Sequence, residues 1–335
     1  MRWYPWLRPA FEQLISQYQA GRAHHALLVH ALPGMGDDAL IYAICRWLMC
    51  EQPEGHKSCG HCRGCQLMQA GTHPDYHLLV AEKGKSSLGI DPVRHITEKL
   101  YSRAGRGGAR IVWIPDAESL TESAANALLK TLEEPPENCW FFLGCREPSR
   151  LLITLRSRCL YWYLAPPQES YALAWLGREI PQESSQLLTA LRLSMGAPGA
   201  ALTLLQPDQW KRRAALCAKL QEALQQRDLL LLNSVLNDDH VVGSLHWLST
   251  LLLDALKVRR GAGDWLTNPD AGAVIHQLCS IMSEAVTQAV LHHLFQCREQ
   301  LRDVPGLNRE LMLTELLLRW EQWMQPGATL PAAYL

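Results

Sequence analysis

Four cysteines near the start of the chain have the spacing of a metal site. Cys50, Cys59, Cys62 and Cys65 follow the pattern C-x8-C-x2-C-x2-C. A two-residue gap lets paired sulfur atoms converge on one ion, and four thiolates form the tetrahedral ligand set of structural zinc sites. The pattern predicts a structural Zn²⁺ module over residues 50–65, because four protein ligands leave no open position for a catalytic water. An iron–sulfur cluster or four unligated thiols are the alternatives.

The residues between these cysteines indicate what the module does. His56 and His61 lie in the same loop and are substitute ligands, although four cysteines already complete a site. Lys57 and Arg63 are the cations inside the loop, and two cations are a weak electrostatic footprint for a nucleic-acid backbone. We therefore expect a structural or protein-contact module in preference to a DNA-binding one.

A second segment has the spacing of a phosphate-binding loop but lacks the residues that bind phosphate and magnesium. The run Ala31-Leu-Pro-Gly34-Met-Gly36-Asp37-Asp38 separates a predicted strand from a predicted helix. Its form is that of G-x-x-x-x-G-K-[ST], in which the lysine neutralises the outer phosphates and the hydroxyl binds magnesium. Here an alanine replaces the first glycine, Asp37 stands at the lysine position, and Asp38 stands at the hydroxyl position.

These two aspartates oppose nucleotide binding. Two like charges about 4 Å apart repel each other by roughly 4 kcal/mol at an effective dielectric constant of ~20, so Asp37 and Asp38 disfavour a phosphate in the loop. The same carboxylates stabilise the positive end of the helix that they begin. We therefore expect the loop to persist as a turn that binds no ATP, with an ordinary strand-to-helix turn as the alternative.

Strands and helices alternate through the first half of the chain, and they would position both features. Strands are predicted from apolar, β-branched and aromatic runs, and helices from capping residues and proline stops. The predicted strands are residues 27–30, 76–80, 110–114 and 140–143, and the predicted helices are residues 37–49, a helix that starts at Asp91-Pro92, and residues 121–134. This alternation predicts a parallel α/β sheet.

Two breaks divide the chain into three predicted domains. Residues 165–167 (Ala-Pro-Pro) end the alternating pattern, and helical periodicity follows them. Residues 206–208 (Gln-Pro-Asp) have the composition of a second linker. We predict an α/β domain over residues 1–165, a small helical domain over 166–207 and an all-helical domain over 208–335.

The last predicted helix carries an apolar stripe after Asn308, which is placed to cap it. Its apolar residues recur at three- and four-residue intervals, as one face of a helix requires. They are Leu313, Leu316, Leu317, Trp320 and Met324. The stripe is the core of the helical domain or, alternatively, a subunit contact.

Composition excludes several classes of protein. Of the 335 residues, 48% are apolar and 19% are charged, which excludes a wholly disordered chain. The net charge of −1 argues against a protein that binds polyanions by bulk attraction. The N-terminal residues lack the features of a signal peptide, and no window approaches the ~18 uninterrupted apolar residues of a membrane span. Eleven cysteines, an odd number, favour the reducing cytoplasm over a disulfide framework.

Two local motifs resemble one protein family. The run Asn126-Ala-Leu-Leu-Lys130-Thr-Leu-Glu-Glu-Pro-Pro136 and the later triplet Ser157-Arg158-Cys159 resemble the clamp-loader branch of the AAA+ ATPases. The resemblance covers essentially the whole chain, and its strongest motifs lie between residues 25 and 160. It implies an AAA+-like parallel-sheet domain with an inserted zinc module, then a small helical lid and a helical collar that joins subunits.

The resemblance also implies that the ATP site is degenerate. In active relatives, a magnesium-binding Asp and a catalytic Glu end the strand before this helix, and these positions fall here on Pro115 and Asp116. The polar sensor falls on Cys145 or Arg146, and Gly199 stands at the position of a sensing arginine in the lid. The resemblance therefore implies a chain that neither binds nor hydrolyses ATP.

Arg158 is nevertheless retained, and the resemblance implies a role for it in trans. In this family the arginine of the triplet reaches the ATP site of the neighbouring subunit, where a guanidinium stabilises the charge of phosphoryl transfer. The alternative is a local pair with a carboxylate. The implied partners are clamp-loader ATPase subunits and a delta-type clamp-opening subunit, with the sliding clamp and primed DNA reached through the complex.

Two other functions remain open on the sequence. One is a divergent AAA+ ATPase that acts alone, which predicts ATP binding by the isolated chain and which Asp37 disfavours. The other is a zinc-containing DNA-binding protein, which predicts tight and salt-sensitive DNA binding and which the net charge of −1 disfavours. The expected function is therefore a non-ATPase scaffold of a clamp loader.

Overall fold

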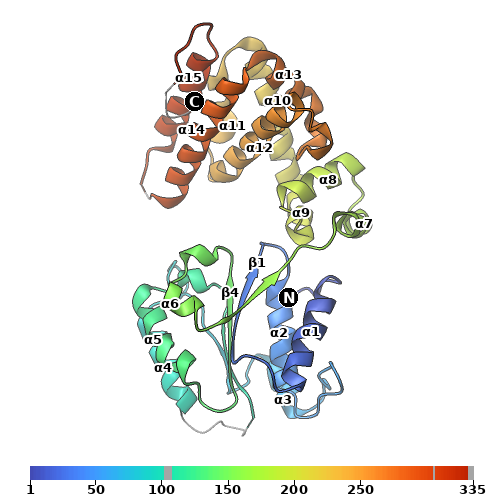
Figure 1. Ribbon diagram of the computed structural model, residues 1–335, viewed down its shortest axis with the longest axis vertical. Helices are drawn as coiled ribbons and strands as arrows, with labels where there is room; N and C mark the ends of the chain where they lie inside the picture. The colour runs from blue at the N-terminus through green and yellow to red at the C-terminus, as the bar shows by residue number, and fades with distance from the viewer. Residues whose placement is uncertain (102–107, 305, 331–335) are drawn as a thin grey trace. The chain divides into compact units, whose positions relative to one another are not determined.

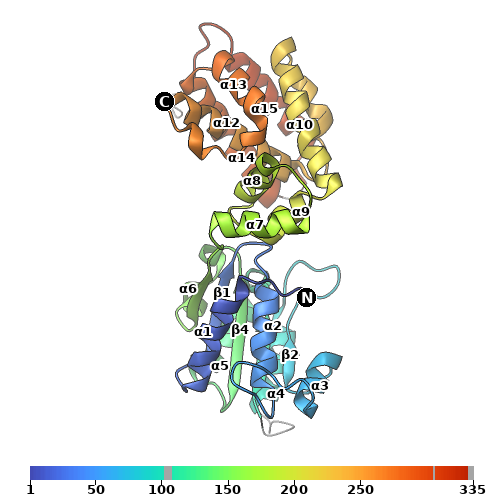
Figure 2. The same cartoon turned by 90° about the vertical axis from the view of Figure 1, so that its right-hand side faces the viewer.

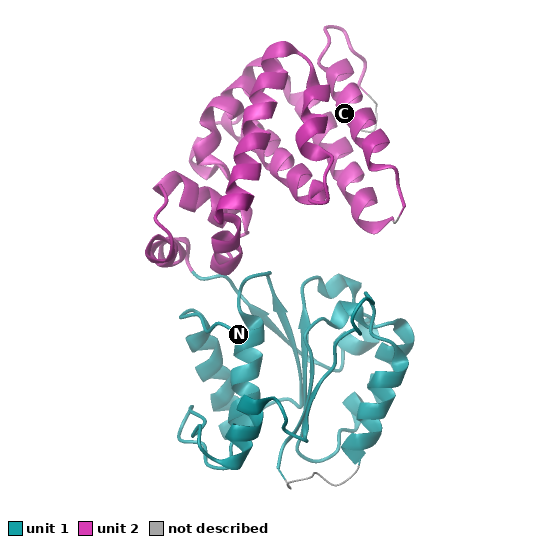
Figure 3. Ribbon diagram, turned by 180° about the vertical axis from the view of Figure 1, so that it is seen from behind, with its two compact units in different colours: residues 1–167 teal, residues 168–335 magenta. Residues whose placement is uncertain are grey.

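The computed structural model describes residues 1–101, 108–304 and 306–330 and divides into two compact units. Unit 1 spans residues 1–167 and is an α/β domain, and unit 2 spans residues 168–335 and is helical throughout its described part (Figure 1, Figure 3). The end of unit 1 lies two residues beyond the first predicted boundary.

Unit 1 is built on a five-stranded parallel sheet with the order β2-β3-β4-β1-β5. The strands are β1 (Ala26–Ala31), β2 (Tyr76–Leu78), β3 (Arg110–Ile114), β4 (Cys139–Cys145) and β5 (Leu160–Leu164). The predicted parallel sheet is confirmed. The strand β5 was not predicted; it lies at one edge of the sheet, where most of its side chains stay partly exposed.

Helices cover both faces of this sheet (Figure 1). The helices on one face are α1 (Leu7–Gln19), α2 (Asp37–Leu48) and α3 (Arg63–Ala70), and those on the other are α4 (Ile90–Tyr101), α5 (Glu122–Glu133) and α6 (Ile153–Arg156). Short 3-10 turns follow β3 and β4, η1 (Ala117–Ser119) and η2 (Pro148–Arg150). The sheet core is thus enclosed on both sides, as the apolar runs of central parallel strands require.

Capping explains where two of these helices begin. Thr121 accepts a hydrogen bond from the backbone N–H of Ala124 at 3.2 Å and caps α5, which begins one residue after the predicted start at residue 121. The prediction that α4 starts at Asp91-Pro92 is wrong by one residue, because Ile90 is already helical and both residues lie in the first turn. Proline fits there, since the first turn has no intrahelical acceptor for its missing N–H.

The strand order brings two loops together at one edge of the sheet. β1 and β4 are neighbours although 107 residues lie between the end of β1 and the start of β4, and His30 pairs with Cys145 in their register. The segments that follow these strands therefore meet at the carboxyl edge of the sheet. In open parallel sheets, ligands bind at this edge, where the strand order reverses.

Unit 2 consists of helices and short 3-10 turns. The helices are α7 (Glu169–Glu179), α8 (Ser184–Leu193), α9 (Pro198–Leu204), α10 (Pro207–Gln226), α11 (Asn233–Leu236), α12 (Val241–Arg259), α13 (Gly272–Ile281), α14 (Glu284–Asp303) and α15 (Arg309–Trp323). The 3-10 turns are η3 (Leu229–Leu232), η4 (Gly263–Trp265) and η5 (Pro269–Ala271). At the predicted linker of residues 206–208, Gln206 is the N-cap of α10 and Pro207 starts that helix, so the break between α9 and α10 is short.

The apolar stripe of α15 lies in the core of unit 2. Leu313, Leu317 and Trp320 are fully buried in the same cluster as the apolar residues of α10, α12 and α14. Asn308 accepts a hydrogen bond from the backbone N–H of Leu311 at 3.1 Å and caps the helix. The prediction of a domain core is therefore confirmed for these residues.

A buried polar network joins α8, α10 and η5 within unit 2. Arg213, which is 2% exposed, donates hydrogen bonds to both carboxylate oxygens of Asp270 at 2.6 and 2.9 Å. The hydroxyl of Thr189 donates to the same carboxylate at 2.7 Å, and Arg213 also donates to Asn268 at 2.9 Å. Buried hydrogen bonds and ion pairs of this kind fix the packing of the helices that contribute to them.

One described helix, α12, is long and apolar enough to cross a membrane by length and composition alone. Unit 2 buries 61% of its apolar window, and the core helix of a soluble domain meets the same criteria. Asp254, near its C-terminal end, is fully buried and paired with Lys257 at 2.8 Å. The burial of α12 therefore matches a role in the helical core.

Candidate functional site

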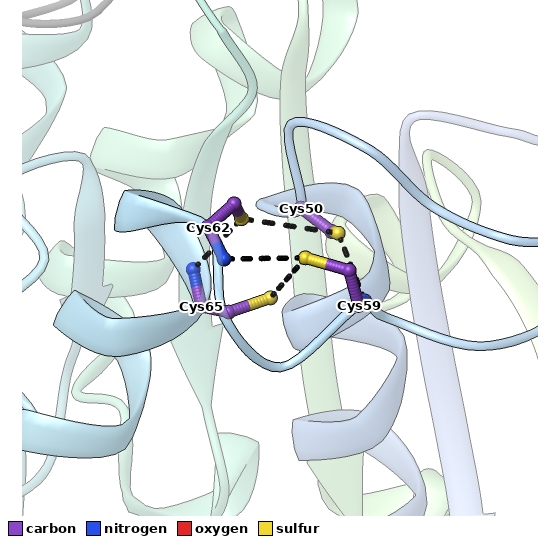
Figure 4. A group of neighbouring side chains, drawn as sticks. All are labelled: Cys50, Cys59, Cys62 and Cys65. Carbon is purple, nitrogen blue, oxygen red and sulfur yellow. Dashed lines mark hydrogen bonds between the residues drawn. The ribbon is translucent and has the colours of Figure 1, made fainter.

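The four predicted metal ligands converge on one point (Figure 4). The sulfur atoms of Cys50, Cys59, Cys62 and Cys65 all lie within 4.8 Å of one another, with Cys50–Cys62 at 4.0 Å and Cys59–Cys65 at 3.9 Å. Thiolates bound tetrahedrally to zinc at about 2.3 Å lie about 3.8 Å apart, whereas bonded sulfurs lie about 2.05 Å apart. This group has the spacing and donor set of a metal centre, and it could hold a metal ion.

Local backbone structure fixes these cysteines. Cys62 is the N-cap of α3, and its sulfur accepts a hydrogen bond from the N–H of Cys65. The sulfur of Cys50 accepts from the N–H of Cys59 at 3.2 Å, and that of Cys59 accepts from the N–H of Cys62 at 3.3 Å. Gly64 is required, because a Cβ there would lie 2.2 Å from the carbonyl oxygen of Met49.

Burial and local hydrogen bonds shift the pKa values of the cysteine thiols in different directions. Burial raises the pKa of the Cys65 thiol to about 12 and also raises the pKa of Cys50. Burial acts in the same direction on Cys62, but hydrogen bonds from backbone N–H groups, that of Cys65 first, outweigh it and lower its pKa to about 6. A dication at the centre would hold all four groups as thiolates, because metal binding displaces thiol protons.

The two histidines of this loop lie outside the four-cysteine group. The Nδ1 atom of His61 is 3.0 Å from the carbonyl oxygen of Cys59. The Nε2 atom of His56 is 3.4 Å from the hydroxyl of Ser16 on α1. Among the residues that the structure describes, the metal-type cluster therefore consists of the four cysteines alone.

The phosphate-type loop contains an internal ion pair. Asp37, the first residue of α2, is buried, and its carboxylate accepts a hydrogen bond from Nη1 of Arg146 at 2.9 Å. The same Nη1 donates to the carbonyl oxygen of Ala31 at 2.9 Å. The β1–β4 register explains this contact, since Arg146 directly follows β4 beside the end of β1. Asp38 is exposed and lies outside the pair.

Residues from the N-terminal segment pack on the same loop. The indole N–H of Trp6 donates to the carbonyl oxygen of Met35 at 2.8 Å, and the ring of Tyr4 stacks on Trp6. Gly36 has a left-handed φ of +83°, and a Cβ there would lie 2.5 Å from the Tyr4 ring. The loop, which includes Gly34, is therefore held from both sides, by Arg146 and by this aromatic pair.

The acidic residues beside the loop interact with neighbouring groups of the same chain. Glu118 accepts a hydrogen bond from the backbone N–H of Arg146 at 2.6 Å. Burial first and the neighbouring Glu118 second raise the pKa of Asp116, which reduces its ability to bind a cation. Asp116, Pro115, Arg146 and Arg150 line a cavity of about 550 Å³ with charges of both signs.

Arg158 lies between α6 and β5 and pairs with a carboxylate on α5. Its Nε donates to Glu133 at 2.7 Å, its Nη2 donates to the same oxygen, and its Nη1 donates to the carbonyl oxygen of Thr154 at 2.8 Å. The Arg158 side chain is 28% exposed and that of Glu133 is 50% exposed. In the isolated chain, the arginine thus has the local partner that the alternative interpretation expected.

The structure adds contacts that sequence reasoning did not identify. The pairs Asp37–Arg146 and Glu133–Arg158 join residues 109 and 25 positions apart. The only sequence signal for the first pair is an aspartate at a lysine position and a cation at a sensor position. Gly199, predicted at the position of a sensing arginine, is buried in the first turn of α9 in unit 2.

Three family models of DNA polymerase III subunits together match residues 6–322 of the chain. The family model described as DNA polymerase III, delta subunit, matches residues 6–168, and its C-terminal model matches residues 207–322. The model of the DNA polymerase III subunit delta', AAA+ ATPase lid domain, matches residues 167–206. The DNA polymerase III subunit delta' of Escherichia coli K12 is 58% identical over 335 residues, which is the full length of both chains.

The chain belongs to the DNA polymerase III delta-prime subunit family. A second relative, the delta' subunit of Yersinia pestis, is 54% identical over 99% of this chain and 100% of its own. A solved gamma-subunit-related protein of Thermotoga maritima aligns with a TM-score of 0.45 at 18% identity, over 93% of this chain and 100% of its own. The family resemblance of the sequence is thus confirmed at the level of the delta-prime subunit, with an AAA+ lid segment.

Proposed function

We propose that the chain is a non-ATPase subunit of the bacterial DNA polymerase III clamp loader, which loads the sliding clamp onto primed DNA during replication. Membership of the delta-prime family supports the complex. The observation that carries the proposal is the phosphate-type loop, whose lysine position holds Asp37 paired with Arg146. The chain acts in this complex as a scaffold and contributes Arg158 to a neighbouring ATPase subunit.

Several contacts support the absence of ATP chemistry in this chain. A bound nucleotide would place its phosphates beside the carboxylate of Asp37, and like charges repel there. Arg146 neutralises that carboxylate from within the fold and is therefore not a free cation for a phosphate. The carboxylate of Glu118 is likewise engaged by backbone N–H groups. The remaining acidic position, Asp116, has a raised pKa and a proline before it.

The position of Arg158 supports a role in trans. Partly exposed ion pairs such as Arg158–Glu133 contribute about 0–1 kcal/mol, so a neighbouring subunit can draw the guanidinium away at low cost. A planar and permanently charged guanidinium stabilises the charge that develops on a transferred phosphoryl group. Three nearby arginines are less suited: Arg146 pairs with Asp37, Arg156 donates to the Pro148 carbonyl, and Arg150 lines the cavity.

The remaining parts of the proposal concern partners, zinc and location. The partners are hetero-oligomeric clamp-loader ATPase subunits and a delta-type clamp-opening subunit. The four cysteines hold a structural Zn²⁺, because their spacing and N–H···S hydrogen bonds fit tetrahedral thiolate ligation. The chain acts in the cytoplasm, as expected for a replication subunit.

The domain organisation is proposed as an AAA+-like domain over residues 1–165, a lid over 166–207 and a collar over 208–335. The match of the lid model to residues 167–206 supports the middle segment. The hydrogen bond from Thr189 to Asp270, a carboxylate that Arg213 also binds, joins this lid to the collar helices. A lid that cannot rotate freely on its collar suits a scaffold.

The test is the DNA- and clamp-stimulated ATPase activity of the complex reconstituted with its motor subunits. Complexes would contain wild-type chain, Arg158→Ala chain, Arg150→Ala chain as the matched control, or no added chain. We expect wild type and Arg150→Ala to stimulate equally and Arg158→Ala to lose the turnover of the adjacent site. Equal stimulation by Arg158→Ala and wild type would remove the role in trans, and ATP binding by the isolated chain would refute the scaffold assignment.

A further inference from the structure

The outer edge of strand β2 has unpaired backbone groups. β2 is the first strand of the sheet, with β3 on its one paired side. Ile111 N–H donates to the Asp75 carbonyl at 2.9 Å and Leu79 N–H donates to the Trp113 carbonyl at 2.8 Å, so odd-numbered residues face β3. The backbone of Leu78 therefore faces outward, and within the described residues no other backbone group is bonded to it. An exposed edge of this kind can pair with another strand.

A large pocket lies on the sheet face beside this edge and is lined by residues of α2, α3 and β2. Figure 2 shows α2 and α3 near β2. The pocket has a volume of about 790 Å³. Aromatic rings, a thioether and a leucine form one part of its wall: Trp3, Tyr42, Met68, Tyr76, Leu78 and Trp113. Leu78 is 48% exposed, so the apolar surface continues from the pocket onto the strand edge.

Two polar groups of this wall have no partner within the described part of the chain. Arg46, in the last turn of α2, lines the pocket and takes part in no hydrogen bond or ion pair there, and its Nε is buried. The indole N–H of Trp113 is buried and has no acceptor. Buried donors without acceptors are destabilising, which favours an occupant that brings acceptor oxygens.

We propose that β2 and this pocket bind an extended segment of a partner protein that carries a large apolar residue and, two positions along, a carboxylate. The segment adds as a strand to the open edge at Leu78, and main-chain hydrogen bonds supply most of the affinity. Side chains two positions apart point to the same face of a strand, about 6.5–7 Å from each other. The apolar side chain fills the aromatic pocket, and the carboxylate pairs with Arg46.

This occupant follows from the charge and the shape of the site. An unpaired guanidinium in an apolar wall attracts a carboxylate, and the pair forms charge-assisted hydrogen bonds. Aromatic walls suit a large side chain, and the strand edge suits an extended backbone. The site uses neither the phosphate-type loop nor Arg158, so it does not depend on the proposed role in clamp loading.

The test measures fluorescence anisotropy of labelled hexapeptides with the zinc-loaded full chain. The probe is acetyl-Thr-Phe-Thr-Glu-Thr-Thr-amide, and its comparisons carry Gln for Glu or methyl groups on the central backbone nitrogens. We expect the Glu peptide to bind about 10-fold more tightly than either comparison, as one charge-assisted hydrogen bond allows. Arg46→Gln should remove the preference for Glu over Gln, while Arg94→Gln, on the opposite face of the sheet, should keep it.

A second variant and a second measurement guard against misfolding. Leu78→Lys alters an exposed side chain and should weaken the Glu peptide without changing the melting temperature, and bound peptide should slow amide exchange at Leu78. The proposal is overturned if no peptide saturates the wild type below about 1 mM. It is also overturned if Arg46→Gln keeps the preference, if the methylated peptide binds equally, or if sedimentation shows a second copy of the chain covering the edge.

Discussion

Replacing Arg146 by glutamine tests how the phosphate-type loop is held. In the native chain, Nη1 of Arg146 donates to Asp37 and to the Ala31 carbonyl, both at 2.9 Å. The Asp37 side chain is 6% exposed, whereas that of Arg146 is 41% exposed. A neutral and shorter glutamine cannot make both contacts. The substitution therefore leaves a buried carboxylate that only the amino end of α2 stabilises.

The exposed fractions of the Asp37 and Arg146 side chains set the expected loss of stability. Hydrogen bonds to charged groups contribute about 1.5–3 kcal/mol, and breaking a fully buried ion pair costs about 3–5 kcal/mol. Because water already reaches much of Arg146, we expect the lower part of this range, about 2 kcal/mol. Asp37→Asn keeps an acceptor oxygen for Arg146 and should cost about 1 kcal/mol, with a coupling energy of about 1 kcal/mol between the two positions.

Native-state hydrogen exchange of the α2 and β1 amides is the suitable assay, because a chain of two compact units need not unfold in a single step. A loss of about 2 kcal/mol accelerates exchange about 30-fold. Arg150→Gln, on the same edge of the sheet, is the matched control and should change exchange less than about twofold.

Two results would refute this reasoning. The first is unchanged exchange in α2 and β1 for Arg146→Gln, which would mean that the ion pair does not hold the loop. The second is simple additivity in the double variant Asp37→Asn/Arg146→Gln, which would mean that the two side chains do not stabilise each other.

Three further predictions concern the metal centre and unit 2. Purified chain should contain one zinc ion per molecule by elemental analysis. Cys62→Ser should release the zinc and expose residues 51–64 to proteolysis. An iron–sulfur absorption band would contradict the assignment of zinc. Arg213→Ala leaves the carboxylate of Asp270, which is 14% exposed, without its cation and should destabilise unit 2 by about 3 kcal/mol in thermal melts. Arg212→Ala, which loses a part-exposed contact with Asp238 at 3.5 Å, should cost under about 1 kcal/mol. Burial, and Arg298 beside it, lower the pKa of His246, so the unfolded chain binds a proton at this histidine more readily than the folded chain does. The stability of unit 2 should therefore fall as the pH drops below about 6.5. A His246→Gln variant whose stability depends on pH as strongly as that of the wild type would contradict this.

Central strands and capped helices could be predicted because their signals are local. β3 coincides with the predicted residues 110–114, since a strand buried on both faces is a continuous apolar run. Asn308 caps its helix as predicted, because a cap contacts only the next turn. The helices α1 and α3 were missed: one mixes polar and apolar residues, and the other spans only eight residues inside the cysteine loop.

Candidate site residues that lie close together in the sequence could also be predicted, whereas their distant partners could not. The cysteine group could be predicted because its ligands lie within sixteen residues of sequence, where short loops alone bring the sulfurs together. The triplet around Arg158 is equally local. The partner of Arg158 was left open between a neighbouring subunit and a carboxylate, and the structure supplies Glu133 from α5 within the chain.

The sequence by itself determined the parallel α/β first half, the helical second half, the cysteine ligand set and the replacement of a lysine by Asp37. Only the tertiary structure decided what Asp37 contacts. The strand order places β4 beside β1, and that order brings Arg146 across 109 residues to the start of α2. Likewise, the open edge of β2 follows from which strand ends the described sheet, and Arg46 lines the pocket beside that edge. Strand order depends on packing among distant segments, so no local pattern of residue types encodes it.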